Sequence, residues 1–373
     1  MQAIILLAGK GSRMGKLTEN THKSLINISE NESFLSRLMH QLNEYSFSKI
    51  VVITGYKHEL IKTALSNYQL NIESVVNSKY DEDTNILSVK LAMEKLDFSQ
   101  PTIIIEGDVW LDDIAMKQIY EQSLKNRSIW FTKGEFNIDQ RGGIININIQ
   151  DEPQEVLVVK KYEKKYSSFK KMTGIMTIGS NEIESCFDQV KKQVELENDQ
   201  YFFNPWTKNL SQLKSVIFDL NPKHLFSANT LEELETLRNY YKDTDIPIIE
   251  LVSLKTLNPI EDYIEERYEI VLEKIKSENI WTKPIIIDDQ HHLILDGHHR
   301  FEVAKELGFK VIPAIKVSYV KIPIWSLRLD EKVNHELVVA KALKRKIYPN
   351  KTVKHSFPFQ IPSCRYTFES LLK

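Results

Sequence analysis

The chain carries a glycine-rich, basic loop directly after its first apolar segment, in the sequence LLAGKGSRMG. Such a loop is suited to phosphate groups, because glycine lets backbone N–H groups approach closely and cations neutralise the charge. No Gly-Lys-Ser/Thr follows at the spacing of a Walker loop, and a short glycine loop alone is equally compatible with a tight turn. The residues concerned are Gly9, Gly11 and Gly15, with the basic Lys10, Arg13 and Lys16.

A second anion-binding pattern, DGHHR, lies near the other end of the chain. An apolar segment ends at Asp296, Gly297 permits a tight turn, and a helix is expected to begin at the basic residues that follow. Backbone N–H groups at a helix start attract anions, and a guanidinium adds to that attraction. We therefore expect His298, His299 and Arg300 to contact phosphate, although paired histidines are more often exposed polar residues.

Two carboxylates stand at positions that could do chemistry. Asp108 ends the apolar run IIIEGDVWL, and ligands of open α/β sheets lie at the carboxyl ends of strands. We therefore favour a functional role for Asp108 over a plain turn residue. Glu261 belongs to an acidic run with Asp262, Glu265 and Glu266. From the residues alone, a solvated surface is the better interpretation of that run.

These residues must be positioned by regular elements, and the first 240 residues alternate short apolar runs with segments of helical spacing. The pattern predicts an α/β fold with βαβ units, a Rossmann-like mixed and mostly parallel sheet, and helices on both faces. The expected strands are 3–7, 49–54, 72–76, 102–106, 128–131 and 143–149, and the expected helices are 34–45, 57–67, 86–95 and 231–241.

The polar segment 241–247 ends in proline and separates this region from a second one. We therefore predict two domains, residues 1–243 and residues 247–373. The second should be a smaller α+β domain. Its expected strands are 248–252, 284–288 and 311–317, with a strand that ends at Asp296, and its expected helices are 265–277 and 300–307.

The composition excludes several classes of protein. With 49 Lys+Arg against 51 Asp+Glu, the net charge of −2 argues against a DNA-coating protein. Cys186 and Cys364 are too few and too distant for a disulfide framework or a zinc site, which favours a reducing compartment. No apolar run reaches the ~20 residues of a membrane span, and the start resembles a mature cytoplasmic protein rather than a signal peptide.

The segment LLAGKGSRMGKLTENTHKSL resembles the signature of nucleotidyltransferases that join an NTP to a phosphorylated small molecule, and is most similar to phosphocholine-type cytidylyltransferases. The segment 77–96, with Tyr80, Asn85 and Ser88, and the later TGIMTIG and NPWTKNL fit the same family, so the resemblance covers about residues 1–240. It implies attack of a phosphomonoester oxygen on the α-phosphorus of CTP, with pyrophosphate released. The implied nucleotide contacts are Leu7, Ala8, Gly9, Gly11, Ser12, Tyr80, Asn85 and Ser88.

The same resemblance implies roles for charged residues. Arg13 would hold the β- and γ-phosphates, Lys23 would lie between the α-phosphate and the incoming phosphate, and Asp108 would bind Mg²⁺. The family carries a second metal-binding aspartate where this chain has Asn229 in LFSANTLEELETL. An amide offers an oxygen without charge, so metal binding should weaken, unless Asp112 or Asp113 substitutes.

The segment ILDGHHRFEVAKELG resembles the ParB/sulfiredoxin-like fold and, within it, the free-serine kinases; the likeness spans about residues 247–373. It implies that Glu261 is the general base and that Gly297, His298, His299 and Arg300 bind nucleotide phosphate. Asp296 would bind Mg²⁺ or orient the hydroxyl group. The late motif YPNKTVKHSF implies phosphate or substrate contacts for Lys351, Thr352 and His355.

Together, the two resemblances predict a bifunctional enzyme that phosphorylates L-serine, or a similar amino alcohol, and transfers CMP onto the product to give a compound such as CDP-serine. Its substrates would be small molecules, with CTP and either ATP or ADP as donors. Nucleic acid and membrane are not expected partners, and oligomeric state stays open, a homo-oligomer included. Two alternatives remain: a nucleotidyltransferase for phosphoethanolamine, phosphocholine or a sugar phosphate with a regulatory second domain, and a ParB-like protein that binds CTP and DNA.

Overall fold

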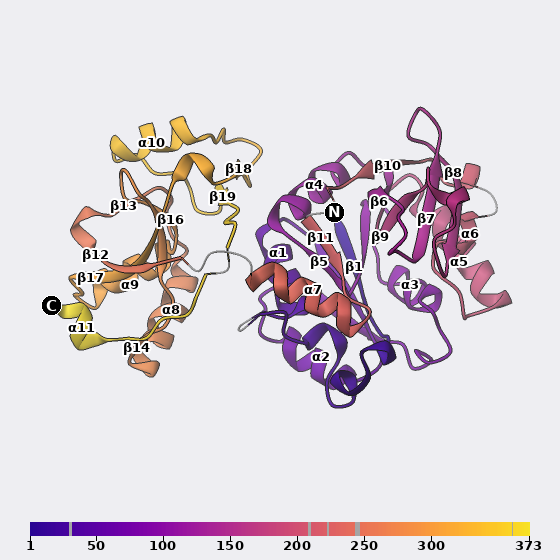
Figure 1. The fold of residues 1–373 in the computed structure, drawn as a ribbon, viewed down its shortest axis with the longest axis horizontal. Coiled ribbons are helices and arrows are strands. Elements are labelled where there is room, and N and C mark those ends of the chain that lie inside the picture. Colours follow the sequence, from indigo (N-terminus) through magenta and orange to yellow (C-terminus); the bar gives the residue numbers. More distant parts are fainter. Residues whose placement is uncertain (30–31, 208–209, 222–223, 243–246, 360) are drawn as a thin grey trace. The chain divides into compact units, whose positions relative to one another are not determined.

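The computed structural model describes residues 1–29, 32–207, 210–221, 224–242, 247–359 and 361–373 of the 373-residue chain. Contacts divide it into two compact units, Met1–Arg238 and Asn239–Lys373 (Figure 1). Most of the linker expected at 241–247 lies outside the described residues, because these exclude 243–246. Each unit is described below by itself.

The first unit is built on a mixed sheet of nine strands, in which the order of the main path is β10-β6-β9-β4-β1-β2-β3. Strands β3, β2, β1 and β4 are parallel neighbours, as are β6 and β10, whereas β9 runs antiparallel between β4 and β6. The strands of the path are β1 (Gln2–Leu7), β2 (Lys49–Thr54), β3 (Ile72–Val76), β4 (Thr102–Glu106), β6 (Ser128–Glu135), β9 (Lys170–Ile178) and β10 (Ser215–Asp219).

Helices cover both faces of this sheet because successive strand residues point to opposite sides. In β1, Ala3 and Ile5 pack into one core with helices α1 (Phe34–Glu44), α2 (His58–Leu65) and α4 (Asp113–Ser123). Ile4 packs into the other core with α3 (Ile86–Met93), α5 (Ile183–Leu196) and α6 (Asn204–Thr207). The predicted α/β class, with a Rossmann-like mixed sheet, is confirmed.

Shorter elements complete the first unit. Strands β7 (Gly142–Ile147) and β8 (Pro153–Val159) form a hairpin on β9, and β5 (Val109–Leu111) pairs with β11 (Leu225–Ser227). Two 3₁₀ segments, η1 (Ser12–Thr18) and η2 (Lys23–Leu25), follow the glycine loop, and α7 (Leu231–Lys242) ends this part of the chain.

The second unit contains a five-stranded sheet in the order β12-β17-β15-β16-β13. Ile285 and Ile287 of β15 face a core with helices α8 and α9, while Ile286 between them faces a core with α10. The elements are β12 (Ile249–Ser253), β13 (Asn258–Pro259), α8 (Glu265–Glu278), β15 (Ile285–Asp288), β16 (Leu293–Asp296), α9 (His298–Glu306), β17 (Val311–Val317) and α10 (His335–Leu343). Three further short pieces are β18 (Ile324–Ser326), β19 (Val353–His355) and α11 (Phe368–Leu372).

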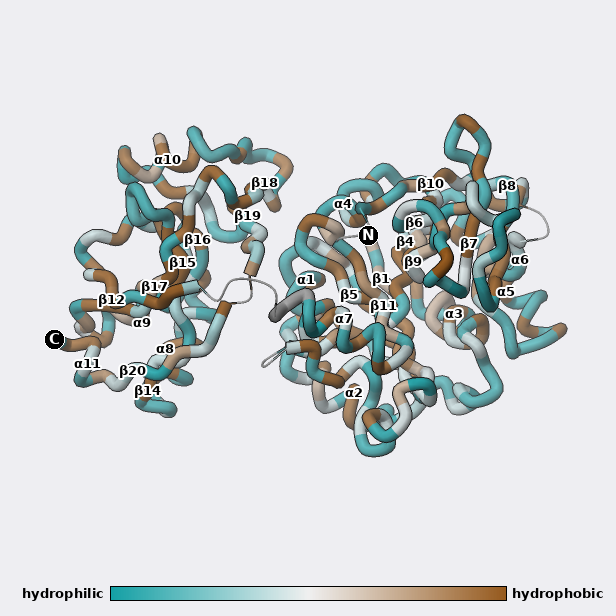
Figure 2. The backbone as a smooth tube through the Cα atoms, viewed as in Figure 1, coloured by the Kyte–Doolittle hydropathy of each residue, from teal (hydrophilic) through white to brown (hydrophobic). Residues whose placement is uncertain are grey.

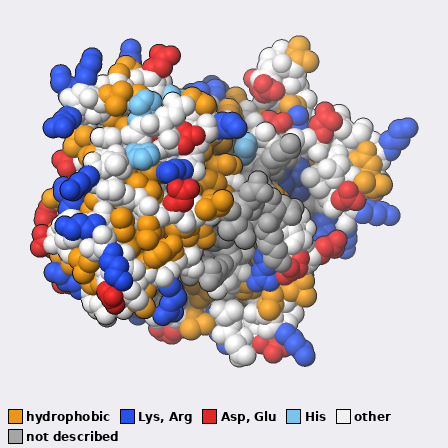
Figure 3. Space-filling model, turned by 60° about the vertical axis from the view of Figure 1, so that its left-hand side comes forward, with side chains coloured by type: hydrophobic (Ala, Val, Ile, Leu, Met, Phe, Trp, Pro, Cys, Tyr) orange, Lys and Arg blue, Asp and Glu red, His pale blue; other side chains and the backbone are white. Residues whose placement is uncertain are grey.

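The distribution of polarity follows these layers. Hydrophobic residues are concentrated along the central strands of each unit (Figure 2). On the face shown in Figure 3, the described basic and acidic side chains are interspersed and form no continuous basic surface there. No helix in the described part of the chain is both long and apolar enough to cross a membrane.

Candidate functional sites

A cleft of about 430 Å³ opens in the first unit at the carboxyl ends of β1 and β4. Its wall includes all but one of the residues that the family resemblance implies for the first unit's site. The exception is Ser12, the exposed first residue of η1. The predicted residues in the wall are Leu7, Ala8, Gly9, Gly11, Arg13, Lys23, Tyr80, Asn85, Ser88, Asp108 and Asn229.

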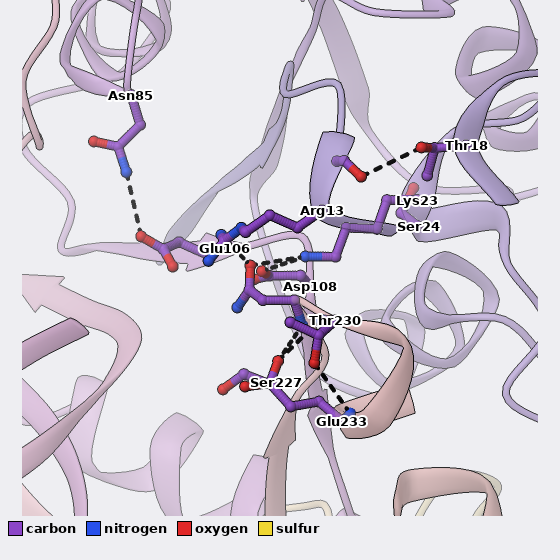
Figure 4. Close-up of polar contacts among 12 residues, drawn as sticks. Arg13, Thr18, Lys23, Ser24, Asn85, Glu106, Asp108, Ser227, Thr230 and Glu233 are labelled. Atoms are coloured by element: carbon purple, nitrogen blue, oxygen red, sulfur yellow. Dashed lines mark hydrogen bonds and ion pairs between the residues drawn. The ribbon is translucent and has the colours of Figure 1, made fainter. Parts of the chain in front are cut away.

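Two cations and a carboxylate meet in this cleft (Figure 4). Lys23 donates through Nζ to Asp108 Oδ2 at 2.7 Å and to Asn229 Oδ1 at 3.1 Å. Arg13 donates through Nη2 to the same oxygen of Asn229 at 2.6 Å. Arg13 and Lys23 therefore meet Asn229, which is more than 200 positions away in sequence. The amide oxygen of Asn229 accepts a hydrogen bond from each of the two cations.

Close backbone packing fixes the position of Asp108. The segment that carries Asp108 crosses the end of β1 at Gly107, where a Cβ atom would lie 2.1 Å from Leu7 Cδ2 and 2.7 Å from the carbonyl oxygen of Leu6. Only glycine fits at such an approach. The carbonyl of Asp108 in turn accepts a hydrogen bond from Ala228 N at 3.2 Å, which ties this segment to the chain that leads to Asn229.

A capping interaction at the start of α7 holds Asn229. Glu233 accepts hydrogen bonds from the backbone N–H groups of Asn229 (2.5 Å) and Thr230 (3.1 Å). Thr230 Oγ1 accepts from Glu233 N at 3.3 Å, which completes the reciprocal Thr-x-x-Glu pattern. Because its N–H group donates to Glu233, the backbone of Asn229 is held in place at the cleft, whose wall includes Asn229.

Ionisable groups in the cleft depart from their usual behaviour. Burial alone would raise the pKa of Asp108, but the charge and hydrogen bond of Lys23 outweigh it, and the pKa of Asp108 is lowered. Burial, followed by repulsion from Asp108, raises the pKa of Glu106 to about 7. The sequence analysis missed Glu106, although it precedes Asp108 by two residues and ends β4.

Asp112 and Asp113, considered as substitutes for a second metal carboxylate, are engaged elsewhere and do not line the cleft. Asp112 caps α4 by accepting from Ala115 N and is paired with His224. Asp113 forms an ion pair with Arg37 at 2.6 Å. The expectation that Asp112 or Asp113 replaces the missing metal-binding carboxylate is therefore wrong.

The segment expected to recognise the base lies at another part of the cleft. Asn85 accepts from Phe202 N at 2.7 Å and donates to Glu106 Oε1 at 3.2 Å. Ser88 is buried and donates to Asp83 Oδ2 at 2.8 Å. These bonds link the start of α3 to the segment that precedes α6, so both walls of this part of the cleft are held together.

In the second unit, Glu261 contacts the late motif that the sequence analysis singled out. Its Oε1 accepts from Thr352 N at 2.5 Å. Burial raises the pKa of Glu261 to about 7, even though the N–H groups of Thr352 and Val353 act in the opposite direction. A carboxylate with a pKa near neutrality is suited to general base catalysis.

The histidines of DGHHR hold the loop that carries Glu261. His298 accepts through Nε2 from the backbone N–H groups of Ile260 (3.2 Å) and Glu261 (3.3 Å), and His299 accepts through Nε2 from Ile264 N at 3.1 Å. An accepting Nε2 requires the neutral ring with its proton on Nδ1. Burial lowers the pKa of His298 to about 4 and also lowers that of His299. The rings therefore carry no charge near pH 7.

Arg300 binds protein groups in this structure. Its Nη1 donates to the carbonyl groups of Lys283 and Pro284, and its Nη2 donates to Asp296 Oδ2 at 2.7 Å. Although burial acts to raise the pKa of Asp296, the charges of Arg300 and Lys283 dominate and bring it to about 2. The geometry makes Arg300 a positioning residue for Asp296. Gly297, with φ of 106°, supplies the turn between β16 and α9.

The three residues expected from the late motif differ in exposure. Lys351 is exposed, whereas Thr352 and His355 are buried. Thr352 Oγ1 donates to the Pro349 carbonyl at 2.7 Å, and His355 Nε2 lies 3.2 Å from Tyr319 Oη. Their substrate contacts remain predictions. The sequence analysis overlooked Lys354, which is near enough to lower the pKa of both Glu261 and Asp296.

Comparison with known proteins defines the class of the first unit. Residues 2–164 match the family described as Nucleotidyl transferase. The chain therefore contains an N-terminal nucleotidyl transferase domain, and its relatives include choline-phosphate cytidylyltransferases. That of Haemophilus influenzae is 35% identical over 133 residues, which are 36% of this chain and 48% of the relative. The solved CTP:phosphocholine cytidylyltransferase of Streptococcus pneumoniae shares the fold, with a TM-score of 0.55, 22% identity, and coverage of 64% of this chain and 97% of that one.

The C-terminal region matches other proteins in part. The ATP-dependent L-serine kinase of Staphylothermus marinus is 37% identical over 92 residues, which are 22% of this chain and 36% of the relative. A ParB-like protein of Sulfolobus acidocaldarius is 41% identical over 71 residues, which are 19% of this chain and 35% of the relative. The chain thus spans about half or less of the Haemophilus and Staphylothermus enzymes. The two predicted resemblances are confirmed.

Proposed function

We propose that the chain is a bifunctional enzyme that phosphorylates L-serine and then transfers CMP from CTP to O-phosphoserine, giving CDP-serine and pyrophosphate. The observation that carries the proposal is the union, in one chain, of cytidylyltransferase and serine-kinase homology. A cytidylyltransferase of this kind consumes a phosphomonoester, and an L-serine kinase produces one. The similarity to the ATP-dependent L-serine kinase of Staphylothermus marinus favours ATP as the phosphoryl donor.

For CMP transfer, the cleft residues would act by positioning and charge neutralisation. Arg13 would bind the β- and γ-phosphates of CTP. Lys23, between Asp108 and Asn229, would hold the α-phosphate against the incoming phosphate oxygen. For the kinase reaction, Glu261 would accept the proton of the serine hydroxyl group, Asp296 would orient that group, and Arg300 would hold Asp296 in place.

Mg²⁺ fits the donor set of the first site. Asp108 supplies a carboxylate and Asn229 an amide oxygen, and each lies within 3.1 Å of Lys23 Nζ. Mg²⁺ is commonly held by one or two carboxylates together with substrate phosphates. When bound, it would neutralise charge on the triphosphate. Among the described residues, no three His, Cys, Asp or Glu side chains are arranged to hold a metal ion, so substrate phosphates would have to complete the coordination.

A change at residue 229 tests this assignment. Asn229→Asp adds a carboxylate while keeping an oxygen for Arg13 and Lys23 to donate to. We expect the Mg²⁺ concentration for half-maximal CMP transfer to fall by about 3–10-fold, since Mg²⁺ prefers charged oxygen ligands. Titration of the initial rate with Mg²⁺ at saturating CTP measures this, with Asn221→Asp as a charge-matched control. An unchanged or higher Mg²⁺ requirement would contradict the assignment.

The whole reaction can be followed by ³¹P NMR with the full chain, CTP, Mg²⁺ and L-serine, and with ATP or ADP as donor. We expect a phosphomonoester signal, followed by a new pair of diphosphate signals and pyrophosphate. Without CTP, the reaction should stop at O-phosphoserine. Threonine, ethanolamine and a sugar 1-phosphate serve as alternative acceptors or acceptor precursors. If only the sugar phosphate yields a nucleotide diphosphate product, the second unit has a different role, and absence of all products refutes both activities.

A further inference from the structure

Two half-buried lysines in the cleft have no part in the mechanism described above. Lys133 lies on β6 and Lys171 on β9, and both side chains line the wall. Lys171 Nζ donates to the carbonyl oxygens of Gly143 (3.1 Å) and Met172 (3.0 Å). Lys133 Nζ donates to Ser227 Oγ at 3.4 Å. Each ammonium group therefore has neutral partners and retains at least one donor, because an ammonium carries three.

The carboxylates in electrostatic reach of the two lysines are bound by other groups. Asp108 is paired with Lys23, Glu233 accepts from the start of α7, and Glu106 accepts from Asn85. No carboxylate in the described part of the chain lies within 4 Å of either lysine nitrogen. Burial, with repulsion from Lys133, lowers the pKa of Lys171 to about 8.

Two neighbouring half-buried cations that repel each other and have no carboxylate within 4 Å are costly, and an anionic group of a ligand would relieve that cost. The triphosphate and the reacting phosphate are already assigned to Arg13 and Lys23. An anion at the lysine pair must therefore come from another part of the acceptor. Phosphoserine has such a group in its carboxylate, whereas phosphoethanolamine, otherwise the same molecule, has none.

We propose that Lys133 and Lys171 bind the carboxylate of the acceptor, and that the cytidylyltransferase site thereby selects phosphate esters of hydroxy acids or amino acids. This rests on the proposed CMP transfer and specifies its substrate class. The two lysines would then be the residues that discriminate between phosphoserine and phosphoethanolamine or phosphocholine.

The test compares kcat/KM for O-phosphoserine and O-phosphoethanolamine in the wild type, Lys133→Met and Lys171→Met. We expect the wild type to prefer phosphoserine, and each variant to lower that preference by about 10–100-fold, which is the usual loss of a hydrogen bond to a charged group. Lys170→Met is the matched control, because Lys170 neighbours Lys171 but pairs with Asp219 and does not line the cleft. It should leave the preference unchanged.

Equal losses with both acceptors would mean that the lysines serve the shared phosphate, and no loss with either would mean that they are structural; both results overturn the inference. Lys171→Met also removes the hydrogen bonds to the carbonyl oxygens of Gly143 and Met172, so the two acceptors are compared at a temperature well below the thermal midpoint of each variant. If the wild type transfers CMP to neither acceptor, the proposed function fails separately. The inference is then decided by thermal shifts: greater stabilisation by phosphoserine than by phosphoethanolamine, abolished in Lys171→Met, supports it, and equal stabilisation overturns it.

Discussion

Replacement of Glu261 by glutamine is expected to lower the rate of phosphoserine formation by at least about 100-fold, the size of a general-base contribution. Glutamine keeps an oxygen for the N–H group of Thr352, so the loop should stay in place, but it cannot take a proton. CMP transfer from supplied O-phosphoserine should be retained, since it depends on a different unit. The two rates are measured separately by coupled assays of phosphoserine and pyrophosphate.

Asp262→Asn is the matched control, because Asp262 is adjacent but exposed. It should keep both activities. The pH profile gives a second criterion: because the base must be ionised and the pKa of Glu261 is raised to about 7, the wild-type kinase rate should fall roughly tenfold per pH unit below that value and level off above it. A folded Glu261→Gln protein that lost both activities, or kept the kinase, would contradict the separate assignment of the two sites.

Lys23→Met should have the opposite pattern, lowering CMP transfer by about 100–1,000-fold, as expected for removal of one preorganised charge from an active site. Phosphorylation of serine should continue. The reason is structural, because Lys23 Nζ bridges Asp108 and Asn229 at the place assigned to the reacting phosphates. Accumulation of phosphoserine in the presence of CTP, followed by ³¹P NMR, is the expected result.

Loss of Lys23 also leaves Asp108 without its partner, so folding must be controlled. The double variant Lys23→Met/Asp108→Asn removes both charges and should restore any lost thermal stability without restoring transfer. Lys16→Met, in the preceding 3₁₀ segment η1 but exposed and outside the cleft wall, should behave as the wild type. CMP transfer by Lys23→Met at more than a tenth of the wild-type rate would show that Lys23 is not at the reacting phosphates.

Elements with a strong local pattern were predictable. The expected strands 49–54, 72–76 and 102–106 match β2, β3 and β4 at both ends, because apolar β-branched residues dominate each of these short runs. Strand β9 was not predicted, because its sequence KKMTGIMTI begins with two lysines and contains a glycine. Its position between β4 and β6 depends on pairing with distant strands, which no local pattern reports.

The site residues likewise divide into those with a local sequence pattern and those that only the tertiary structure brings together. The glycine loop and Asp108 follow apolar runs, so the sequence indicated them, and the structure places them in one cleft. Lys133 and Lys171 had no local signal, because a lysine in an alternating strand usually faces solvent, and only the tertiary structure brings both into the same wall. Nor could the sequence reveal that Arg300 would bind carbonyl groups of residues 283 and 284.

The role of His298 and His299 as proton acceptors has a consequence for how the second unit responds to acidity. A phosphate site that relies on histidine cations gains affinity as the pH falls through about 6.5. Here the bonded ring nitrogens face backbone N–H groups, and the low pKa of His298 keeps it neutral well below that pH. Mild acidification therefore adds no charge at His298, and His298 should make no pH-dependent contribution to anion binding. The two histidines of the motif act as neutral hydrogen-bond acceptors that hold the loop of Glu261.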